Sequence, residues 1–421
     1  MEDVPVEVIG EILSRVETAR DIVIASATCR KWRKAFTKHL HTLSFNSNDL
    51  PFYGDLTSSK HEILITQTIF QTTGLQKLSI LKYYDNDDDE FSASALVAWL
   101  MYTRETLKQL FYNVKTSPNI NILELCGRQH QLEKLVLGHN SIIGVEPNFQ
   151  RFPCLKSLSL GHVSISALDL NYLLAACPKI ESLELVAPEI LISDPQVTVE
   201  LASSKLKNVY VEGISLEKFI LEADCIERLH FKDCVIDVFE LIGKGTLKHF
   251  EVDKVTIIHF EIGDTHENLE IVDISSFTII WPNFHQMITR FTKLRRLRLW
   301  DIDFGEEDEI VDLETIAVCF PQLRSLSYDL KEWVLLHGLQ GDVDLENLVV
   351  VELRWTTLTD LFVHWVEGVL NRCPNLQKLV IYGIVSGAKT REECQILANF
   401  TTSIVQLMRR FIHVDVQFEY E

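Results

Sequence analysis

The stretch Leu132-Glu-Lys-Leu135-Val-Leu137-Gly-His-Asn140-Ser-Ile142 decides the fold of this chain, because its spacing recurs along most of the sequence. By position it reads L-x-x-L-x-L-x-x-N-x-I, with apolar residues at the first position and at +3 and +5. The frame begins 13 times, at intervals of 20 to 32 residues, at Leu75, Leu107, Leu132, Leu155, Ile180, Leu206, Ile226, Leu247, Leu269, Leu294, Leu323, Leu348 and Leu376. Such a ladder predicts a solenoid, whose core is buried one repeat at a time.

Each repeat predicts a strand followed by a turn. Alternating apolar residues such as Leu158/Leu160 and Leu297/Leu299 are typical of a strand with one buried face. The pattern resembles the leucine-rich repeat, whose consensus allows Asn or Cys at +8, here Asn140 and Cys234. The resemblance implies an α/β fold, a right-handed leucine-rich-repeat solenoid of about 13 repeats with parallel strands on its concave face.

The second half of the repeat varies along the chain. Apolar residues at helical spacing predict convex helices at residues 167–176, 284–291, 313–319 and 360–371. Pro153, Pro178, Pro321 and Pro374 lie just before the next repeat and are expected to end the preceding helix. Between Leu206 and Leu269 the units are too short for a helix, and alternation at 219–221 and 258–262 predicts short extended segments instead.

Charge and cysteine content argue against several classes of protein. The formal charge of −20 argues against general binding to a phosphate backbone. Two acidic runs, residues 85–90 and 306–309, are interpreted as solvated loops, with docking of a basic partner or a weak cation site as the alternative. We expect no signal peptide, no membrane span and no disulfides among the nine cysteines, hence a cytoplasmic or nuclear protein.

Residues 1–38 do not follow the repeat. Pro5 is expected to open a helix whose apolar face begins at Val8 and continues through Val16. Asp21 is a candidate N-cap for a second helix running through Ala25. So short a segment cannot easily bury two amphipathic helices alone, so its apolar face should dock on the first repeat or on a partner.

This segment resembles an F-box, whose pattern is L-P-x-E-[IL]-[IL]-x-x-I-L-S-x-L, then D-L, then C-[KR]-x-W. The matching residues are Pro5, Glu7, Val8, Ile9, Ile12, Leu13, Ser14, Val16, Asp21, Ile22, Cys29, Arg30, Lys31 and Trp32. Val4 replaces the usual Leu, and Glu17-Thr18 replaces a common Pro or Pro-Pro. The order is that of F-box/leucine-rich-repeat proteins, and the Cys177-Pro178 and Cys373-Pro374 junctions look like those of plant members. The expected domains are an F-box at 1–40, the solenoid at 41–391 and a cap of helix and strand at 392–421.

The resemblance implies a non-catalytic substrate receptor of an SCF-type ubiquitin ligase, which binds a Skp-type adaptor and through it cullin and RING subunits. The expected adaptor-binding residues are Pro5, Val8, Ile9, Ile12, Leu13, Val16, Ile22, Ala25 and Trp32. Alternatives are a helix pair that only caps the solenoid, a repeat scaffold acting outside a ligase, and a small-molecule-dependent co-receptor. No catalytic motif, phosphate-binding loop or paired-cysteine metal spacing is present, so neither an enzyme nor a cofactor is expected.

A target protein is expected on the concave face, where side chains at +2, +4 and +6 of each strand point. The candidates are Tyr210, Arg228, His230, Lys232, His249, Arg296, Arg298, Trp300 and Arg354. Aromatic and Arg residues are common interface anchors, and these arginines could bind a carboxylate-rich or phosphorylated segment. The competing interpretation is that opposite charges only pair between neighbouring strands, such as Arg228 with Glu251 and Arg298 with Asp273.

Overall fold

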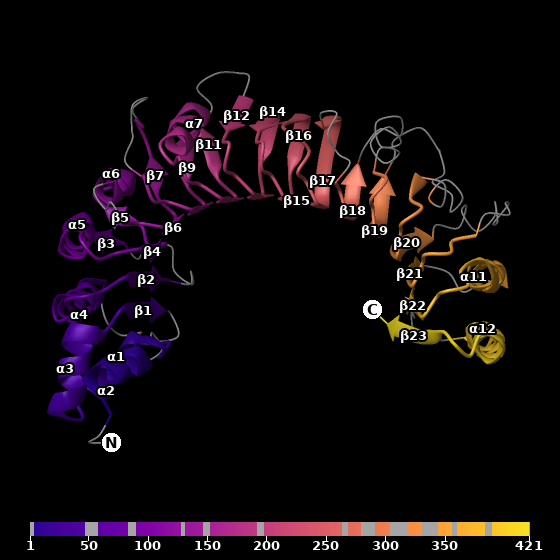
Figure 1. Cartoon of the computed structure of the whole chain (residues 1–421), viewed down its shortest axis with the longest axis horizontal. Helices are drawn as coiled ribbons and strands as arrows, with labels where there is room; N and C mark the ends of the chain where they lie inside the picture. The colour runs from indigo at the N-terminus through magenta and orange to yellow at the C-terminus, as the bar shows by residue number, and fades with distance from the viewer. Residues whose placement is uncertain are drawn as a thin grey trace. The chain divides into compact units, whose positions relative to one another are not determined.

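The fold is α/β, with helices at the N-terminus followed by a long succession of parallel strands (Figure 1). The computed structural model describes residues 4–46, 58–82, 90–127, 131–145, 152–191, 198–262, 268–278, 291–303, 316, 319–330, 344–355, 360–383 and 390–420. The chain forms two compact units, Met1–Asp224 and Cys225–Glu421, called unit 1 and unit 2 below. The acidic residues 85–89 and 306–309 lie outside the described residues.

Unit 1 begins with three helices, α1 (Val6–Ser14), α2 (Ala19–Ser26) and α3 (Arg30–His39). Pro5 precedes α1 as its N-cap and is not its first helical residue. Asp21 does not cap α2: the Thr18 side chain accepts the Asp21 N–H at 3.2 Å, so Thr18 is the cap. The Asp21 carboxylate instead lies in the first turn, where it complements the helix dipole.

The repeats of unit 1 place their strands side by side in one parallel sheet. These strands are β1 (Thr42–Asn46), β2 (Lys77–Leu81), β4 (Gln109–Tyr112), β6 (Lys134–Gly138), β8 (Ser157–Gly161), β10 (Ser182–Val186) and β13 (Asn208–Glu212). Strand β1 was not predicted. It pairs in register with β2, Thr42 opposite Lys77, and its sequence Leu40-x-x-Leu43-x-Phe45 is one further copy of the frame.

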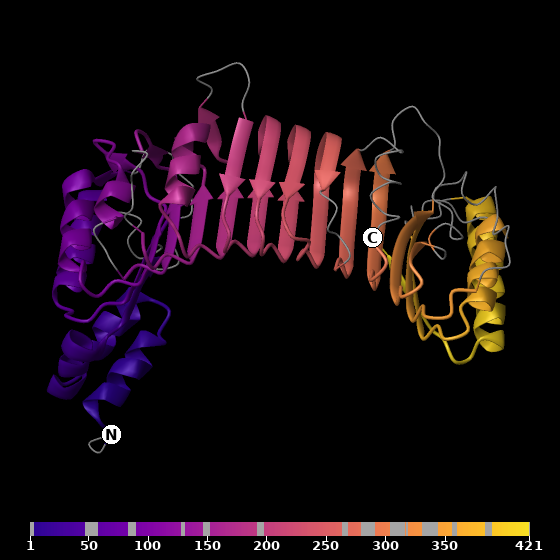
Figure 2. The same cartoon turned by 45° about the horizontal axis from the view of Figure 1, so that its top comes forward.

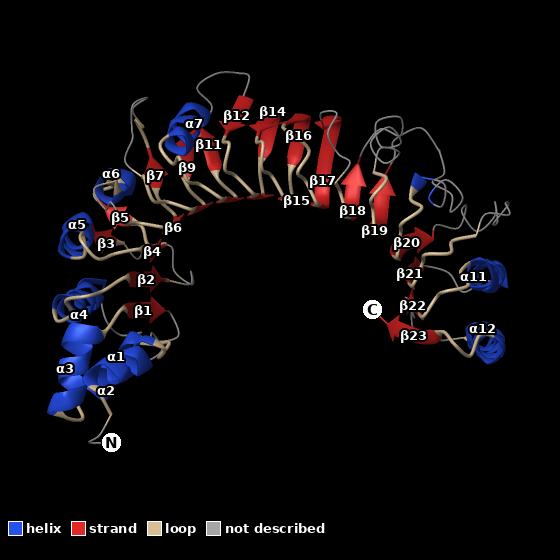
Figure 3. Ribbon diagram, in the orientation of Figure 1, coloured by secondary structure: helices blue, strands red, loops and turns tan. Residues whose placement is uncertain are grey.

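The other side of this sheet carries a second layer of helices and short strands (Figure 3). Its helices are α4 (Ser58–Phe70), α5 (Ala93–Tyr102), α6 (Ile122–Cys126) and α7 (Ala167–Ala175). Its strands are β3 (Phe91–Ser92), β5 (Thr116–Ser117), β7 (Ser141–Ile142), β9 (Ser164–Ser166), β11 (Glu189–Leu191), β12 (Thr198–Ala202) and β14 (Ser215–Glu222). Helix α7 confirms the helix predicted at 167–176, and β14 confirms the extended segment predicted at 219–221.

Unit 2 continues the repeat with parallel strands, which Figure 2 shows in a turned view. Its elements are β15 (Arg228–Lys232), β16 (Val235–Ile242), β17 (His249–Ile262), β18 (Ile271–Thr278), β19 (Arg296–Asp303), β20 (Ser325–Leu330), β21 (Val350–Trp355), α11 (Asp360–Arg372), β22 (Lys378–Gly383), α12 (Arg391–Arg410) and β23 (Asp415–Tyr420). Helix α11 confirms the helix predicted at 360–371, and α12 with β23 confirms the predicted C-terminal helix and strand. The end of β17 pairs with β16, Val235 opposite Thr256, which confirms the extended segment at 258–262. The helices predicted at 284–291 and 313–319 fall almost entirely outside the described residues.

The core consists of the predicted +3 and +5 side chains. Leu158 and Leu160 of β8 have no exposed surface, and Leu297 and Leu299 of β19 are at most 1% exposed. Because consecutive strand residues point to opposite faces, the +2, +4 and +6 side chains lie on the other face, called the open face below. Of the nine cysteines, Cys126, Cys177, Cys234 and Cys373 are buried, and burial raises the pKa of the Cys126, Cys177 and Cys373 thiols to about 12.

One feature of the turn was not predicted. In eight repeats, the residue at +7 has a positive φ, between 43° and 67°. These residues are His139, His162, Ala187, Gly213, Asp233, Lys254, Ser276 and Asp301. Only Gly213 is a glycine, so the backbone demand comes from the repeat geometry and not from the residue type. Within the described residues, no helix combines the length and the apolar character needed to cross a membrane.

Candidate functional site

The N-terminal helices present an apolar surface on α1. Pro5, Val8 and Ile12 follow at intervals of three and four residues, which places them on one side of the helix. Val8 and Ile12 are each 46% exposed, and Pro5 is exposed as well. Three neighbouring apolar residues left to water on one helix are typical of a surface that a partner covers.

Three residues expected on this surface are instead in the core of the unit. Ile9, Leu13 and Ile22 are at most 2% exposed, and α1 and α2 both pack against α3. They can support the surface but cannot contact a partner directly. Val16, Ala25 and Trp32 are half-buried.

Helix α1 crosses α3 at a glycine. A Cβ at Gly10 would lie 2.4 Å from the Cβ and 2.5 Å from the carbonyl oxygen of His39, distances that real carbon atoms do not reach. The α1–α3 contact therefore depends on the missing side chain of Gly10.

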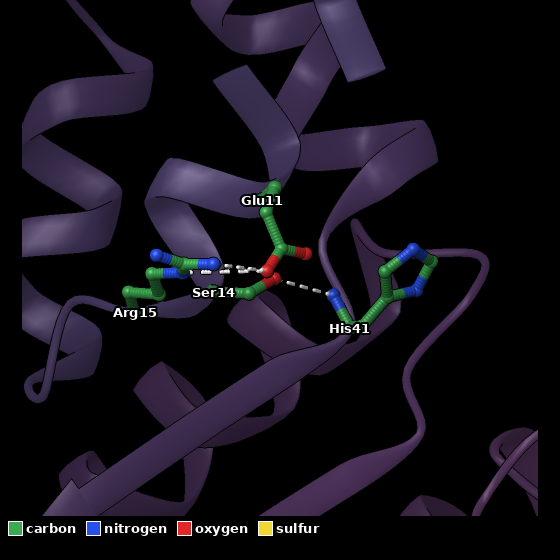
Figure 4. A network of polar contacts seen from close by, with 4 residues as sticks. All are labelled: Glu11, Ser14, Arg15 and His41. Atoms are coloured by element: carbon green, nitrogen blue, oxygen red, sulfur yellow. Dashed lines mark hydrogen bonds and ion pairs between the residues drawn. The ribbon is translucent and has the colours of Figure 1, made fainter. Parts of the chain in front are cut away.

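Hydrogen bonds join the three helices to the first repeats. The backbone N–H of His41 donates to Ser14 Oγ at 3.0 Å, beside the Arg15–Glu11 ion pair at 3.2 Å (Figure 4). The His41 ring Nδ1 lies 3.0 Å from the carbonyl oxygen of Gly74, and the Thr73 N–H donates to the Thr37 carbonyl at 2.9 Å. The helices are thus part of unit 1 and hold a fixed position on its first two strands.

Sequence reasoning missed apolar exposure on α2. Val23 and Ile24 are 40% and 53% exposed, although their neighbours Ile22 and Ala25 were expected at the interface. Both line a cavity of about 260 Å³ between α2 and α4, whose wall also includes Leu64 and Phe91. The sequence could have indicated this exposure, because Val23 and Ile24 are one and two positions after Ile22 and so lie on other sides of the helix.

Strand register sorts the open-face residues of unit 2 into rows. Pairing places Arg228 opposite His249, Ile271 opposite Arg296, and Asp273 opposite Arg298. Side chains at the same repeat position therefore stand next to each other on consecutive strands, roughly 4.8 Å apart. We call these sets the +2, +4 and +6 rows.

The +4 row contains ion pairs between neighbouring strands. Arg298 and Asp273 lie 2.9 Å apart, which confirms the pairing expected from the sequence. Burial raises the pKa of Asp273 against the opposing effect of Arg298. The expected Arg228–Glu251 pair does not form, because Glu251 lies 3.6 Å from His230 Nδ1 and 3.8 Å from His249 Nε2. Burial lowers the pKa of His249, and Glu251 only partly opposes this.

Trp300 is the centre of a second cluster in unit 2. The guanidinium of Arg298 lies 4.5 Å from the indole centroid and that of Arg354 lies 5.5 Å from it, both within cation–π range. The Tyr382 ring meets Trp300 edge-on, with centroids 5.8 Å apart. Aromatic and Arg residues are common anchors of protein interfaces, so this cluster is a candidate contact site for a partner.

The remaining candidates do not join these clusters. Arg228 is exposed, Arg296 is half-buried, and Lys232 Nζ lies 4.0 Å from Asp233. Tyr210 belongs to unit 1, where its hydroxyl donates to Glu212 at 2.5 Å. In the described part of the chain, no three His, Cys, Asp or Glu side chains are grouped so that they could hold a metal ion.

Comparison with known proteins matches both parts of the chain. The F-box-like family matches residues 1–42, and the repeats described as "FBD-associated F-box protein At5g56370, LRR repeats" match residues 99–242. An Arabidopsis thaliana F-box/LRR-repeat protein, At1g67190, is 65% identical over 423 aligned residues that cover 100% of both chains. A second Arabidopsis thaliana protein, F-box protein At1g10780, is 22% identical over 45% of this chain and 44% of its own length.

Proposed function

Because the chain belongs to the F-box/LRR-repeat proteins, we propose that it is the substrate-recognition subunit of an SCF-type ubiquitin ligase. The F-box binds a Skp-type adaptor, which connects it to the cullin and RING subunits. The repeats hold a target protein for ubiquitination. The protein acts in the cytoplasm, the nucleus or both.

The observation that carries this proposal is the apolar surface of α1. Pro5, Val8 and Ile12 are exposed, while Ile9 and Leu13 behind them anchor the helix. A folded module that leaves this surface to water gains free energy when a partner covers it, at roughly 25 cal/mol per Å² of apolar area. A helix pair that only capped the repeats would direct these side chains towards the solenoid.

The receptor does no chemistry in this proposal. Its contribution is proximity: a target lysine held near the ubiquitin-carrying enzyme reacts as if at a high local concentration. Such an arrangement requires a stiff connection between adaptor and target. The bonds of His41 to Ser14 and Gly74 support this, because they fix the F-box on the first repeats.

The test compares two variants of equal chemical change. Val8→Asp/Ile12→Asp places two charges on the proposed adaptor surface without touching the core. Ile143→Asp/Leu168→Asp makes the same change at repeat residues that are 64% and 58% exposed. Recombinant Skp-type adaptor is co-purified with each full-length variant, and circular dichroism verifies folding.

We expect the F-box variant to lose at least about tenfold in adaptor recovery, because two carboxylates cannot be buried without a large desolvation cost. The repeat variant should recover adaptor like the wild type. Undiminished recovery with Val8→Asp/Ile12→Asp would remove the main support for adaptor binding at this surface. Adaptor recovery without cullin would favour a role outside a complete ligase.

A further inference from the structure

The charged side chains of the repeats are sorted by position. At +1, just before each strand, basic and acidic residues alternate from Lys108 to Arg295 and pair between neighbouring repeats. In unit 1 the pairs are Lys156–Glu133 and Lys207–Glu181, both at 3.1 Å. In unit 2 they are Lys248–Glu227 at 3.6 Å and Arg295–Glu270 at 4.0 Å. The +1 position therefore carries charge but little net charge.

The +4 row of unit 2 is also internally compensated. Arg298 pairs with Asp273, Glu251 lies between two histidines, and the Ser327 hydroxyl donates to Glu352 at 2.6 Å. Every carboxylate of this row thus has a neighbouring partner among the described side chains.

The +2 row is different. In unit 2 it carries no carboxylate from β15 to β22, where it consists of Arg228, His249, Ile271, Arg296, Ser325, Val350 and Lys378, and Asp415 of β23 then stands opposite Lys378. Within the described part of the chain, Arg228, Arg296 and Lys378 form no ion pair. Arg228 and Arg296 are thus two cations with no carboxylate next to them in their row, in a protein whose formal charge is −20.

The same rule holds separately in unit 1. Its +2 row contains only uncharged residues and the two lysines Lys77 and Lys134. Their ammonium groups lie 5.1 Å and 5.3 Å from the centroid of the Phe111 ring, which separates them. Carboxylates are therefore absent from this row in the described strands of unit 1 and, in unit 2, from β15 to β22.

We propose that the +2 row of unit 2 binds an extended acidic segment of a partner protein that runs across the strands. This inference rests on the proposed function, for which it defines the chemistry of the target. Cations occur at every third strand of the row, and the strand before Arg296 and Lys378 carries an apolar residue, Ile271 and Val350.

This periodicity sets the spacing of the ligand. Three strand steps correspond to roughly 14 Å, which an extended peptide covers in about four residues. The matching peptide therefore carries acidic residues at i, i+4 and i+8, which all point to the same side of an extended chain. Glutamate and phosphoserine satisfy the same electrostatic requirement.

The neighbouring rows favour a peptide over a nucleic acid. Glu251, Asp273 and Glu352 stand one row away and would repel a continuous phosphate backbone. A peptide with one acid in four residues can instead place its uncharged residues over these carboxylates. Single-stranded RNA serves as the competing ligand in the test.

The experiment measures fluorescence polarisation of three labelled probes with the full chain. One peptide has the sequence ESGIESGIE, the second is its permutation EEEISGISG, and the third probe is a nine-nucleotide RNA. We expect the spaced peptide to bind most tightly. Equal affinity for the two peptides, or tighter binding of the RNA, would overturn the proposal.

A matched pair of variants then locates the site. Arg228→Glu/Arg296→Glu should weaken binding of the spaced peptide at least about tenfold, because two attractive contacts become repulsive. Lys248→Glu/Arg295→Glu makes the same change in charge on the adjacent +1 position and should weaken binding less than threefold. Equal losses would show that general charge, not this row, binds the peptide.

Adaptor recovery separates this proposal from the proposed function. Both charge-reversal variants should co-purify adaptor like the wild type, because neither touches the F-box. If adaptor binding fails while the spaced peptide still binds through Arg228 and Arg296, the ligase role falls and the peptide row stands. If peptide discrimination fails while adaptor binding persists, only the peptide row falls.

Discussion

At the scale of single residues, the turn at +7 requires a left-handed backbone conformation, although most residues at this position are not glycine. A left-handed conformation costs an L-residue roughly 1 to 2 kcal/mol, whereas glycine adopts it freely. Seven of the eight described residues with this conformation at +7 carry a side chain, among them Ala187 and Lys254. Each of these turns therefore stores a small strain that the packing of the repeat sustains.

We predict that Lys254→Gly stabilises the protein by about 0.5 kcal/mol, after subtraction of the entropy that glycine adds to the unfolded chain. Gly213→Ala should destabilise it by about 1 to 2 kcal/mol, because φ is +67° there and the new Cβ would lie 3.2 Å from the Cβ of Ala187. Urea denaturation measures both changes. Gly161→Ala is the control, since its Cβ would have no neighbour closer than 4.0 Å. A loss of stability with Lys254→Gly would contradict this account of the turn.

At the scale of elements, the sequence predicts where helices and strands occur better than which side of them is covered. Val8, Ile9, Ile12 and Leu13 form one continuous apolar arc, so periodicity cannot separate the residues that α3 buries from those left exposed. Only the packing angle of α1 on α3 divides them, and that angle depends on Gly10. Helix α3 was not predicted, although Trp32, Ala35 and Phe36 stand at helical spacing, because the basic residues between them make the segment polar on average.

The ion pairs between neighbouring strands could likewise be predicted only in part. The Arg298–Asp273 pair could be predicted because both residues are at +4 of adjacent repeats, where parallel register brings them together. Arg228 and Glu251 are at +2 and +4, so they belong to different rows, and His230 and His249 take the carboxylate instead. Strand β1 was missed because its repeat follows the F-box without a recognisable boundary.

The α1–α3 contact gives a prediction for this scale. Gly10→Ala should destabilise unit 1 by about 2 kcal/mol or more, because the helices must separate to admit a Cβ, although Ala is the better helix former. Adaptor recovery should fall together with the midpoint of thermal unfolding.

Gly74→Ala provides the matched control for Gly10→Ala. It lies at the same junction between F-box and repeats, but the nearest atom to its Cβ would be 3.7 Å away. Its unfolding midpoint should therefore equal that of the wild type. An unchanged midpoint for Gly10→Ala would mean that the helices cross less closely than the structure indicates.

At the scale of the whole molecule, the chain carries a large negative charge yet arranges its basic residues in repeating positions. The +1 pairs are individually weak, because exposed ion pairs contribute from 0 to about 1 kcal/mol each. Their alternation matters more than any one pair, since each carboxylate is flanked by cations and not by another carboxylate. This order keeps carboxylates apart where the repeats stack closely, although Arg295 and Arg324 are like charges on adjacent repeats.

Exchanging the two charges of the Glu227–Lys248 pair tests whether the alternation of charges along the repeats contributes to stability. Glu227→Lys and Lys248→Glu should each destabilise unit 2 by about 0.5 kcal/mol, because each leaves like charges on adjacent repeats. In the double variant the pair is restored in reverse, but Glu at 248 now stands beside Glu270, so stability should recover only in part. Urea denaturation at 50 mM and 1 M salt measures this, and the deficit should vanish at high salt as screening shortens the range of the repulsion. Complete recovery at low salt would show that Lys248 and Glu227 form an isolated pair, and that the order of charges along the solenoid contributes nothing to its stability.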